Sequence, residues 1–135
     1  MAIGDGLRAL VLDDDESIRT LIVKMMTAHG FETTCAADGL EGLMQLEASR
    51  PDIIICDSMM PNLDGLSFLK AIKQQAATTH IPVIFVTAKT DVASVSETMR
   101  AGASFYLSKP FKRDELVSRI KEGLAAVDIA VASEM

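Results

Sequence analysis

Five polar side chains of this chain each follow a short apolar run, and their types suit one shared site. They are Asp13, Asp14, Asp57, Thr87 and Lys109. Three carboxylates brought close together repel one another, so such a cluster needs a positive group that neutralises it. Hard oxygen ligands of this kind suit Mg²⁺, and Lys109 adds a second positive charge. If the fold brings these residues together, they predict an acidic metal site.

A hydroxyl, an ammonium group and Mg²⁺ around one carboxylate suit phosphoryl transfer. The transferred oxygens need charge neutralisation and hydrogen-bond donors, and the reaction needs little else beyond positioning. A carboxylate can itself attack phosphorus and form an aspartyl phosphate. Asp57 is the best candidate because it ends Ile-Ile-Ile-Cys, a run that is typical of a strand buried on both faces.

Each of these residues also has a simpler interpretation. The acidic run 13–16 could only cap a helix, and Thr87 could be a β-branched residue that ends a strand. The pair Lys109-Pro110 could be an exposed turn, and Asp57 could bond the amides of its own loop. A common location at one edge of one sheet favours the shared site over these separate interpretations.

Apolar runs predict the strands that would create such an edge. The expected strands cover residues 8–13, 31–37, 53–57, 81–86 and 104–107. The runs at 53–57 and 81–86 are almost continuously apolar, which is typical of central strands in a parallel sheet. The run at 31–37 has little contrast between its two faces and is expected at an edge.

Helical periodicity follows each predicted strand. The expected helices begin near Asp15, Leu40, Asp64, Asp91 and Lys112. Their apolar positions include Leu21, Leu40, Met44, Val92, Met99 and Val127. Strands alternating with helices predict an α/β fold, a doubly wound five-stranded parallel sheet with helices on both faces. The carboxyl ends of its strands would then lie along one edge.

Composition limits the classes of function. The 135 residues suit one domain, and a net charge of −6 argues against nucleic-acid binding. Cys35 and Cys56 are expected to be buried and reduced, and with two histidines they are too few for a Cys/His zinc site. Neither a membrane span nor a targeting signal is predicted, so we expect a cytoplasmic protein.

Five motifs make the chain resemble the receiver domain of two-component response regulators, the CheY-like superfamily, over roughly residues 7–125. The motifs are Val-Leu-Asp-Asp-Asp at 11–15, Asp-Ser-Met-Met-Pro-Asn-Leu-Asp-Gly at 57–65, Val-Thr-Ala at 86–88, Ala-Gly-Ala at 101–103 and Tyr-Leu-Ser-Lys-Pro-Phe at 106–111. The resemblance implies a flavodoxin-like (βα)5 fold with strand order 2-1-3-4-5. Residues 1–6 are expected to form a flexible tail, and residues 126–135 to extend the last helix or form a tail.

The resemblance also implies a metal site and an acceptor residue. Asp57 would be the phosphoacceptor. Mg²⁺, with Mn²⁺ as an expected substitute, would be held by Asp14, Asp57 and the backbone carbonyl of Met59. Asp13 would act on the metal through water. The bond between Lys109 and the proline after it is expected to be cis.

By the same resemblance, Lys109 would pair with Asp57 and with its phosphoryl oxygens, and Thr87 would donate its hydroxyl. Thr87 would move toward the phosphoryl group while Tyr106 rotates inward. This switch would change the surface formed by the last two helices and the strand between them. The protein would be a signalling module rather than a conventional enzyme, because it acts only on its own Asp57.

The partners implied are a sensor histidine kinase or a phosphotransfer protein as donor, and a downstream protein target. Neither nucleic acid nor a membrane is expected as a direct partner, and the protein is expected to be a monomer or a weak phosphorylation-dependent dimer. Met59 and Lys89, two residues after Asp57 and Thr87, are expected to tune the lifetime of the phosphoryl group. An apolar and a cationic side chain there offer little to position an attacking water, so slow dephosphorylation is predicted.

Other classes of protein also fit part of the sequence. Asp13-x-Asp15 resembles the opening motif of haloacid-dehalogenase-type phosphatases, but that interpretation leaves Asp57 without a role. A receiver-like interaction module that is never phosphorylated would be expected to lack a residue of the acceptor site. A flavodoxin-like nucleotide binder is disfavoured because no glycine-rich phosphate loop follows the first strand.

Overall fold

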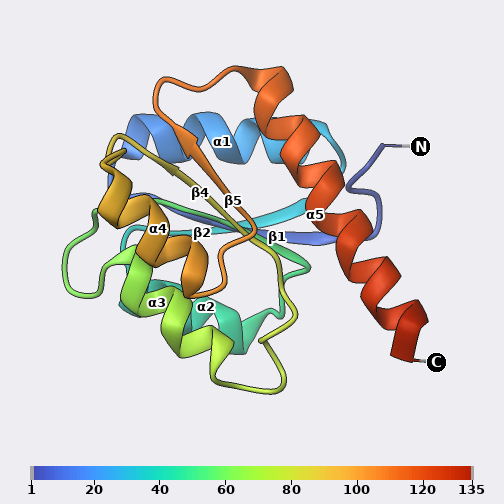
Figure 1. Cartoon of the computed structure of the whole chain (residues 1–135). Coiled ribbons are helices and arrows are strands. Elements are labelled where there is room, and N and C mark those ends of the chain that lie inside the picture. Colours follow the sequence, from blue (N-terminus) through green and yellow to red (C-terminus); the bar gives the residue numbers. More distant parts are fainter. Residues whose placement is uncertain (1, 135) are drawn as a thin grey trace.

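The protein is a parallel sheet with helices on both faces (Figure 1). The computed structural model describes residues 2–134, with side chains over residues 2–127. The strands are β1 (Arg8–Leu12), β2 (Glu32–Ala36), β3 (Ile53–Cys56), β4 (Val83–Thr87) and β5 (Phe105–Ser108). The helices are α1 (Glu16–Ala28), α2 (Gly39–Ala48), α3 (Gly65–Lys73), α4 (Val92–Arg100) and α5 (Arg113–Glu134).

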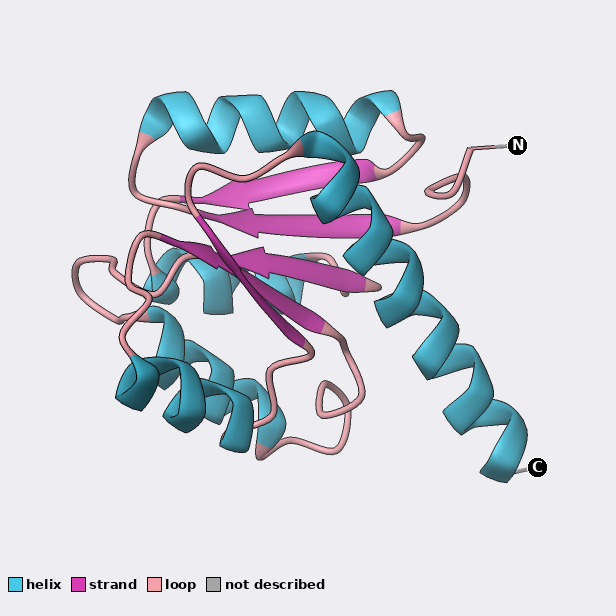
Figure 2. Cartoon of the chain, turned by 45° about the horizontal axis from the view of Figure 1, so that its top comes forward, coloured by secondary structure: helices cyan, strands magenta, loops and turns pink. Residues whose placement is uncertain are grey.

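The strands are ordered β2-β1-β3-β4-β5, and every neighbouring pair is parallel. This confirms the predicted doubly wound topology and its strand order. Helices α1 and α5 cover one face of the sheet, and α2, α3 and α4 cover the other (Figure 2). Because all the strands are parallel, the loop between β1 and α1 lies at the same edge of the sheet as the loop that follows β3.

Two apolar cores lie on the two faces of the sheet. Side chains alternate along a strand, so Ile54 and Cys56 of β3 contribute to one core while Ile53 and Ile55 contribute to the other. All four are at most 1% exposed. Central placement explains why β3 is apolar at every position rather than at alternate ones.

Strand β2 lies at the edge of the sheet, as its weak polarity contrast predicted. The prediction that both cysteines are buried is wrong for one of them, because Cys35 of β2 is exposed while Cys56 of β3 is buried. An edge strand has a neighbour on one side only, so its alternate positions are not all covered by helices.

Aspartates begin four of the five helices. The carboxylates of Asp15, Asp38, Asp64 and Asp91 each accept a hydrogen bond from a backbone N–H in the first turn. Asp15 thus caps α1 and directly precedes its first residue, close to the predicted start of this helix. Gly30 follows α1 with φ +94°, a left-handed conformation that suits a glycine directly after a helix.

Several apolar residues expected on inward helix faces are exposed instead. They are Leu21 (52%), Leu40 (51%), Met44 (70%), Val92 (81%) and Met99 (39%). Helix α2 shows the reason. Its buried face consists of Gly39, Gly42 and Leu46, and a Cβ at Gly42 would lie 2.4 Å from Leu12 Cδ2. The helix approaches the sheet through its glycines, so Leu40 and Met44 turn outward.

The N-terminal residues and the first half of α5 both pack on the core at the α1 face of the sheet. Residues 3–6, within the predicted N-terminal tail, form a turn in which the N–H of Gly4 donates to the carbonyl of His29. Helix α5 continues to Glu134 and extends past the sheet (Figure 1). Side chains of the predicted extension from residue 128 onward lie outside the described residues. Among residues 2–134, none of the helices combines the length and apolar character needed to cross a bilayer.

Candidate functional site

Backbone hydrogen bonds continue the sheet beyond its strands and align the candidate residues at one edge. The N–H of Asp57 donates to the carbonyl of Leu12, and the N–H of Lys109 donates to the carbonyl of Thr87. Asp13 is anchored in the same way to Ala36. Three polar side chains are buried here, with Asp13 1%, Asp57 6% and Thr87 1% exposed. Buried polar groups need partners, and the site supplies them.

Lys109 joins two of the carboxylates. Its Nζ lies 2.8 Å from Asp13 Oδ2 and 3.0 Å from Asp57 Oδ2. Partial burial alone would lower the pKa of Lys109, but its hydrogen bonds to both carboxylates outweigh burial and raise that pKa above its usual value. The Lys109–Pro110 peptide bond is cis, as the resemblance implied. Sequence reasoning paired Lys109 with Asp57 only, and the structure adds Asp13.

Carboxylate oxygens of Asp13, Asp14 and Asp57 all lie within 4.8 Å of one another. Asp14 is exposed, so the cluster opens to solvent on its side. Burial raises the pKa of Asp13 despite its hydrogen bond from Lys109. Clustered carboxylates that keep one open side fit Mg²⁺, which binds few carboxylates and retains waters.

The loop between β3 and α3 is held tightly behind Asp57. The N–H of Gly65 donates to the carbonyl of Ser58, and a Cβ on Gly65 would lie 2.1 Å from the carbonyl oxygen of Asp57. Asn62 has φ +68° and its Nδ2 donates across 2.6 Å to Asp38 Oδ2. These contacts fasten the loop to the start of α2, which positions the main chain around Met59.

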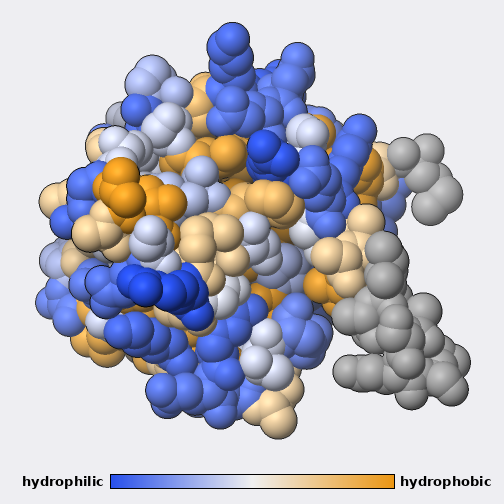
Figure 3. Space-filling model, in the orientation of Figure 1, coloured by the Kyte–Doolittle hydropathy of each residue, from blue (hydrophilic) through white to orange (hydrophobic). Residues whose placement is uncertain are grey.

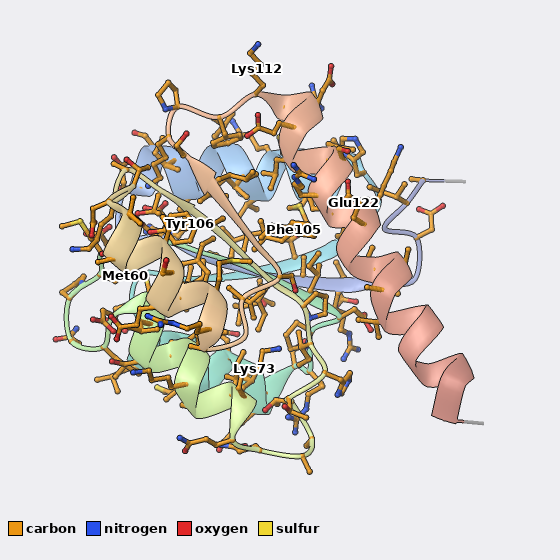
Figure 4. The ribbon with its side chains drawn as sticks, in the orientation of Figure 1. Met60, Lys73, Phe105, Tyr106, Lys112 and Glu122 are labelled. Carbon is orange, nitrogen blue, oxygen red and sulfur yellow. The ribbon has the colours of Figure 1, made fainter. Side chains whose placement is uncertain are left out.

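Thr87 and Tyr106 are linked through one residue of the loop after β4. Thr87 Oγ1 accepts a hydrogen bond from the N–H of Lys89 across 3.2 Å, and Tyr106 Oη donates to the carbonyl of Lys89. The ring of Tyr106 stacks on Phe85, with centroids 5.8 Å apart and planes 2° apart. Figure 4 shows Tyr106 toward α4, with Phe105 on the α5 side of the same strand.

Two polar contacts at this edge were not predicted. Ser58 Oγ lies 3.2 Å from Tyr106 Oη, and one guanidinium nitrogen of Arg19 donates across 2.8 Å to the carbonyl of Asp13. The only sequence signal for Ser58 is its place beside Asp57. Arg19 lies one turn into a helix, where an arginine usually faces solvent, so nothing in the sequence distinguishes it.

An open cavity of about 630 Å³ lies beside the cluster, between the loop after β3 and helix α4. Asp14, Met59 and Lys89 all line this cavity, so the two residues expected to tune phosphoryl lifetime share one space. The side chain of Met59 is 61% exposed. Figure 3 shows an apolar cluster over this region of the surface, near the start of α4.

Residues 9–121 match the model of the response regulator receiver domain family. The chain is 34% identical over 121 residues to the DNA-binding response regulator MtrA of Mycobacterium tuberculosis, an alignment that covers 90% of this chain and 52% of MtrA. The chain spans about half the length of the curated relatives it matches.

Solved structures show the same architecture. The chemotaxis protein CheY4 of Vibrio cholerae matches with a TM-score of 0.82 and 32% identity, covering 87% of this chain and 98% of that chain. The signal receiver domain of a histidine kinase from Syntrophus aciditrophicus matches with a TM-score of 0.82 and 30% identity, covering 90% and 92%. The chain therefore belongs to the response regulator receiver domain family, a signalling module of two-component systems rather than a conventional enzyme.

Proposed function

We propose that Asp57 accepts a phosphoryl group from a phosphohistidine of a sensor histidine kinase or phosphotransfer protein. One observation carries the proposal. Asp57 shares Lys109 with Asp13 at 3.0 and 2.8 Å, and its carboxylate lies within 4.8 Å of both Asp13 and Asp14. A buried acceptor with a cation and an acidic metal-binding group beside it has what in-line phosphoryl transfer requires.

The reaction forms one bond and breaks one. An oxygen of Asp57 attacks phosphorus while the phosphorus–nitrogen bond to the donor histidine breaks, and the imidazole leaves and is protonated by solvent. Lys109 stays beside the transferred oxygens and neutralises part of their charge. Asp14, Asp57 and the carbonyl of Met59 would hold Mg²⁺ or Mn²⁺, with Asp13 acting through water. Bound there, the metal supplies charge neutralisation for the transferred group.

Phosphorylation would change the surface through Thr87. The hydroxyl of Thr87 now accepts from the N–H of Lys89, and an added phosphoryl group on Asp57 offers it a stronger, charged acceptor. Turning toward that acceptor would release the Lys89 N–H and so change the loop whose Lys89 carbonyl holds Tyr106. We propose that this shifts the α4–β5–α5 surface between two states and so selects a downstream protein.

The remaining parts of the proposal concern where and with what this domain acts. We propose that it works in the cytoplasm as a monomer or weak phosphorylation-dependent dimer and contacts proteins rather than nucleic acid. The net charge of −6 supports the last point for this domain itself.

Intact mass spectrometry after incubation with acetyl phosphate tests the acceptor role. We expect one added phosphoryl group that requires Mg²⁺ and is absent in Asp57→Asn. Asp114→Asn, an exposed carboxylate in the first turn of α5, is the matched control and should be modified like the wild type. Equal labelling of Asp57→Asn, or no labelling of any of the three proteins even with rapid quenching, would contradict the proposal.

A further inference from the structure

A row of hydrogen bonds crosses the site from the residue after Asp57 to Thr87. Ser58 Oγ lies 3.2 Å from Tyr106 Oη, Tyr106 Oη donates to the carbonyl of Lys89, and the N–H of Lys89 donates to Thr87 Oγ1 across 3.2 Å. The row joins the loops that follow β3 and β4 through a side chain of β5. Sequence reasoning included Thr87 and Tyr106 but gave Ser58 no part.

The direction of the hydrogen bond between Ser58 and Tyr106 follows from the bond between Tyr106 and Lys89. A phenol has one proton, and Tyr106 uses it toward the Lys89 carbonyl. Ser58 is therefore the donor to Tyr106 Oη, and the tyrosine oxygen both donates and accepts. A phenol oxygen with both functions filled, on a ring stacked flat on Phe85 and packed against the core, has few reasons to turn outward.

We infer that Ser58 is a positioning residue that holds Tyr106 inward before any phosphorylation takes place. The loop that carries the acceptor would then set the position of the tyrosine directly. In the unphosphorylated protein, most molecules would already have the Tyr106 ring inward, and the α4–β5 surface would be in the corresponding state. Phosphorylation would then increase a population that is already the larger one. The link to signalling rests on the proposed function, whereas the link between Ser58 and Tyr106 does not.

The loss of one hydrogen bond sets the size of the effect. Removing the Ser58 hydroxyl should lower the ratio of inward to outward Tyr106 about fivefold. Ser58→Thr keeps a hydroxyl at the same place and should preserve most of that ratio. Ser94→Ala is the matched control. Ser94 and Ser58 both line the cavity beside the acidic cluster, but the Ser94 hydroxyl donates to Asp91 Oδ2 at 2.8 Å rather than to Tyr106.

The protein contains one tyrosine and no tryptophan, so its fluorescence reports on Tyr106 alone. Acrylamide quenching of that fluorescence in the unphosphorylated protein tests the inference. We expect Ser58→Ala to increase the quenching constant, and Ser58→Thr and Ser94→Ala to stay near the wild type. An unchanged constant in Ser58→Ala, or a change as large in Ser94→Ala, would overturn it.

A second measurement separates this inference from the acceptor proposal. Beryllofluoride with Mg²⁺ mimics a bound phosphoryl group, and it should reduce quenching more in Ser58→Ala than in the wild type, whose ring is already inward. A larger reduction in the wild type would contradict the preset position. If beryllofluoride altered none of the proteins, the acceptor proposal would fail, and the comparison without it would still decide the role of Ser58.

Discussion

The ammonium group of Lys109 lies 2.8 Å from Asp13, closer than its 3.0 Å distance from Asp57. One lysine thus neutralises two buried carboxylates of the cluster, and the third, Asp14, is left toward solvent. This division assigns separate tasks to neighbouring aspartates. Asp13 holds the lysine in the protein, whereas we expect the exposed Asp14 to meet an incoming cation.

Replacing Lys109 by methionine should destabilise the protein by roughly 1–3 kcal/mol, because two buried carboxylates lose their partner. Urea unfolding at neutral pH measures this loss. Adding Asp13→Asn to the variant should restore part of the stability, since one unpaired charge is then removed. Lys121→Met, at an exposed position of α5, should change little. An equal loss in both lysine variants would argue against the pairing.

The same ion pair predicts a dependence on alkaline pH. The pKa of Lys109 is raised in the folded protein above its ordinary value of 10.5. The stabilisation is therefore complete below pH 10.5 and is lost as the pH rises through the folded pKa. The difference in unfolding free energy between wild type and Lys109→Met should shrink over that window. A difference that stays constant as the pH rises would contradict this.

Mg²⁺ should raise the melting temperature, because it relieves repulsion within the carboxylate cluster and binds only the folded state. Asp14→Asn should reduce that increase, which differential scanning calorimetry with and without Mg²⁺ can measure. Glu16→Gln removes another exposed charge two residues away and should respond like the wild type. If all three proteins respond equally, the metal binds elsewhere.

Met59 and Lys89 border the cavity next to the acidic cluster. Because an apolar and a cationic side chain offer little to position an attacking water there, we expect the phosphoryl group to be long-lived. The double variant Met59→Asn with Lys89→Glu supplies an amide and a carboxylate that can hold an attacking water. Its phosphoryl lifetime, followed by intact mass, should shorten roughly tenfold or more. An unchanged or longer lifetime would remove the basis for this role.

Gly65→Ala should displace the acceptor loop, since the new Cβ would lie 2.1 Å from the carbonyl oxygen of Asp57. We expect slower labelling by acetyl phosphate and a loss of roughly 1–3 kcal/mol in stability. Gly123→Ala is the control within a helix, where the nearest atom to the added Cβ is Pro82 Cβ at 3.4 Å. That variant should be neutral or stabilised, so equal effects of both substitutions would contradict the argument.

Acid should weaken the hydrogen bond from Asn62 to Asp38, which holds the loop after β3 to the start of α2. Hydrogen bonds from the N–H of Glu41 and, with a smaller effect, from the amide of Asn62 hold the pKa of Asp38 below its ordinary value of 3.8. This stabilisation is present above pH 3.8 and is lost as the pH falls through the folded pKa. The advantage of wild type over Asp38→Asn in urea midpoint should therefore shrink between pH 7 and pH 3. A gap that does not change with pH would show that the charge is not involved.

Much of the fold could be predicted because the signals are local. Continuous apolar runs at 53–57 and 81–86 identified the central strands, and Asp64 marked the start of a helix by chemistry that acts within one turn. The gathering of the acidic residues at one edge follows from strands that alternate with helices through right-handed crossovers, whereas the strand order was expected from the resemblance to the receiver family. The sequence by itself thus determined the architecture and the composition of the candidate site.

Only the tertiary structure decided how those residues divide their contacts. The exposure of Met44 depends on how closely α2 approaches the sheet. The exposure of Cys35 depends on which positions of the edge strand β2 are covered by helices. The bonds of Lys109 to Asp13 and Asp57 join segments 96 and 52 residues apart, and the contact between Ser58 and Tyr106 joins segments 48 residues apart. Hydrophobic periodicity describes one element at a time, whereas these contacts depend on the distances at which separate elements pack.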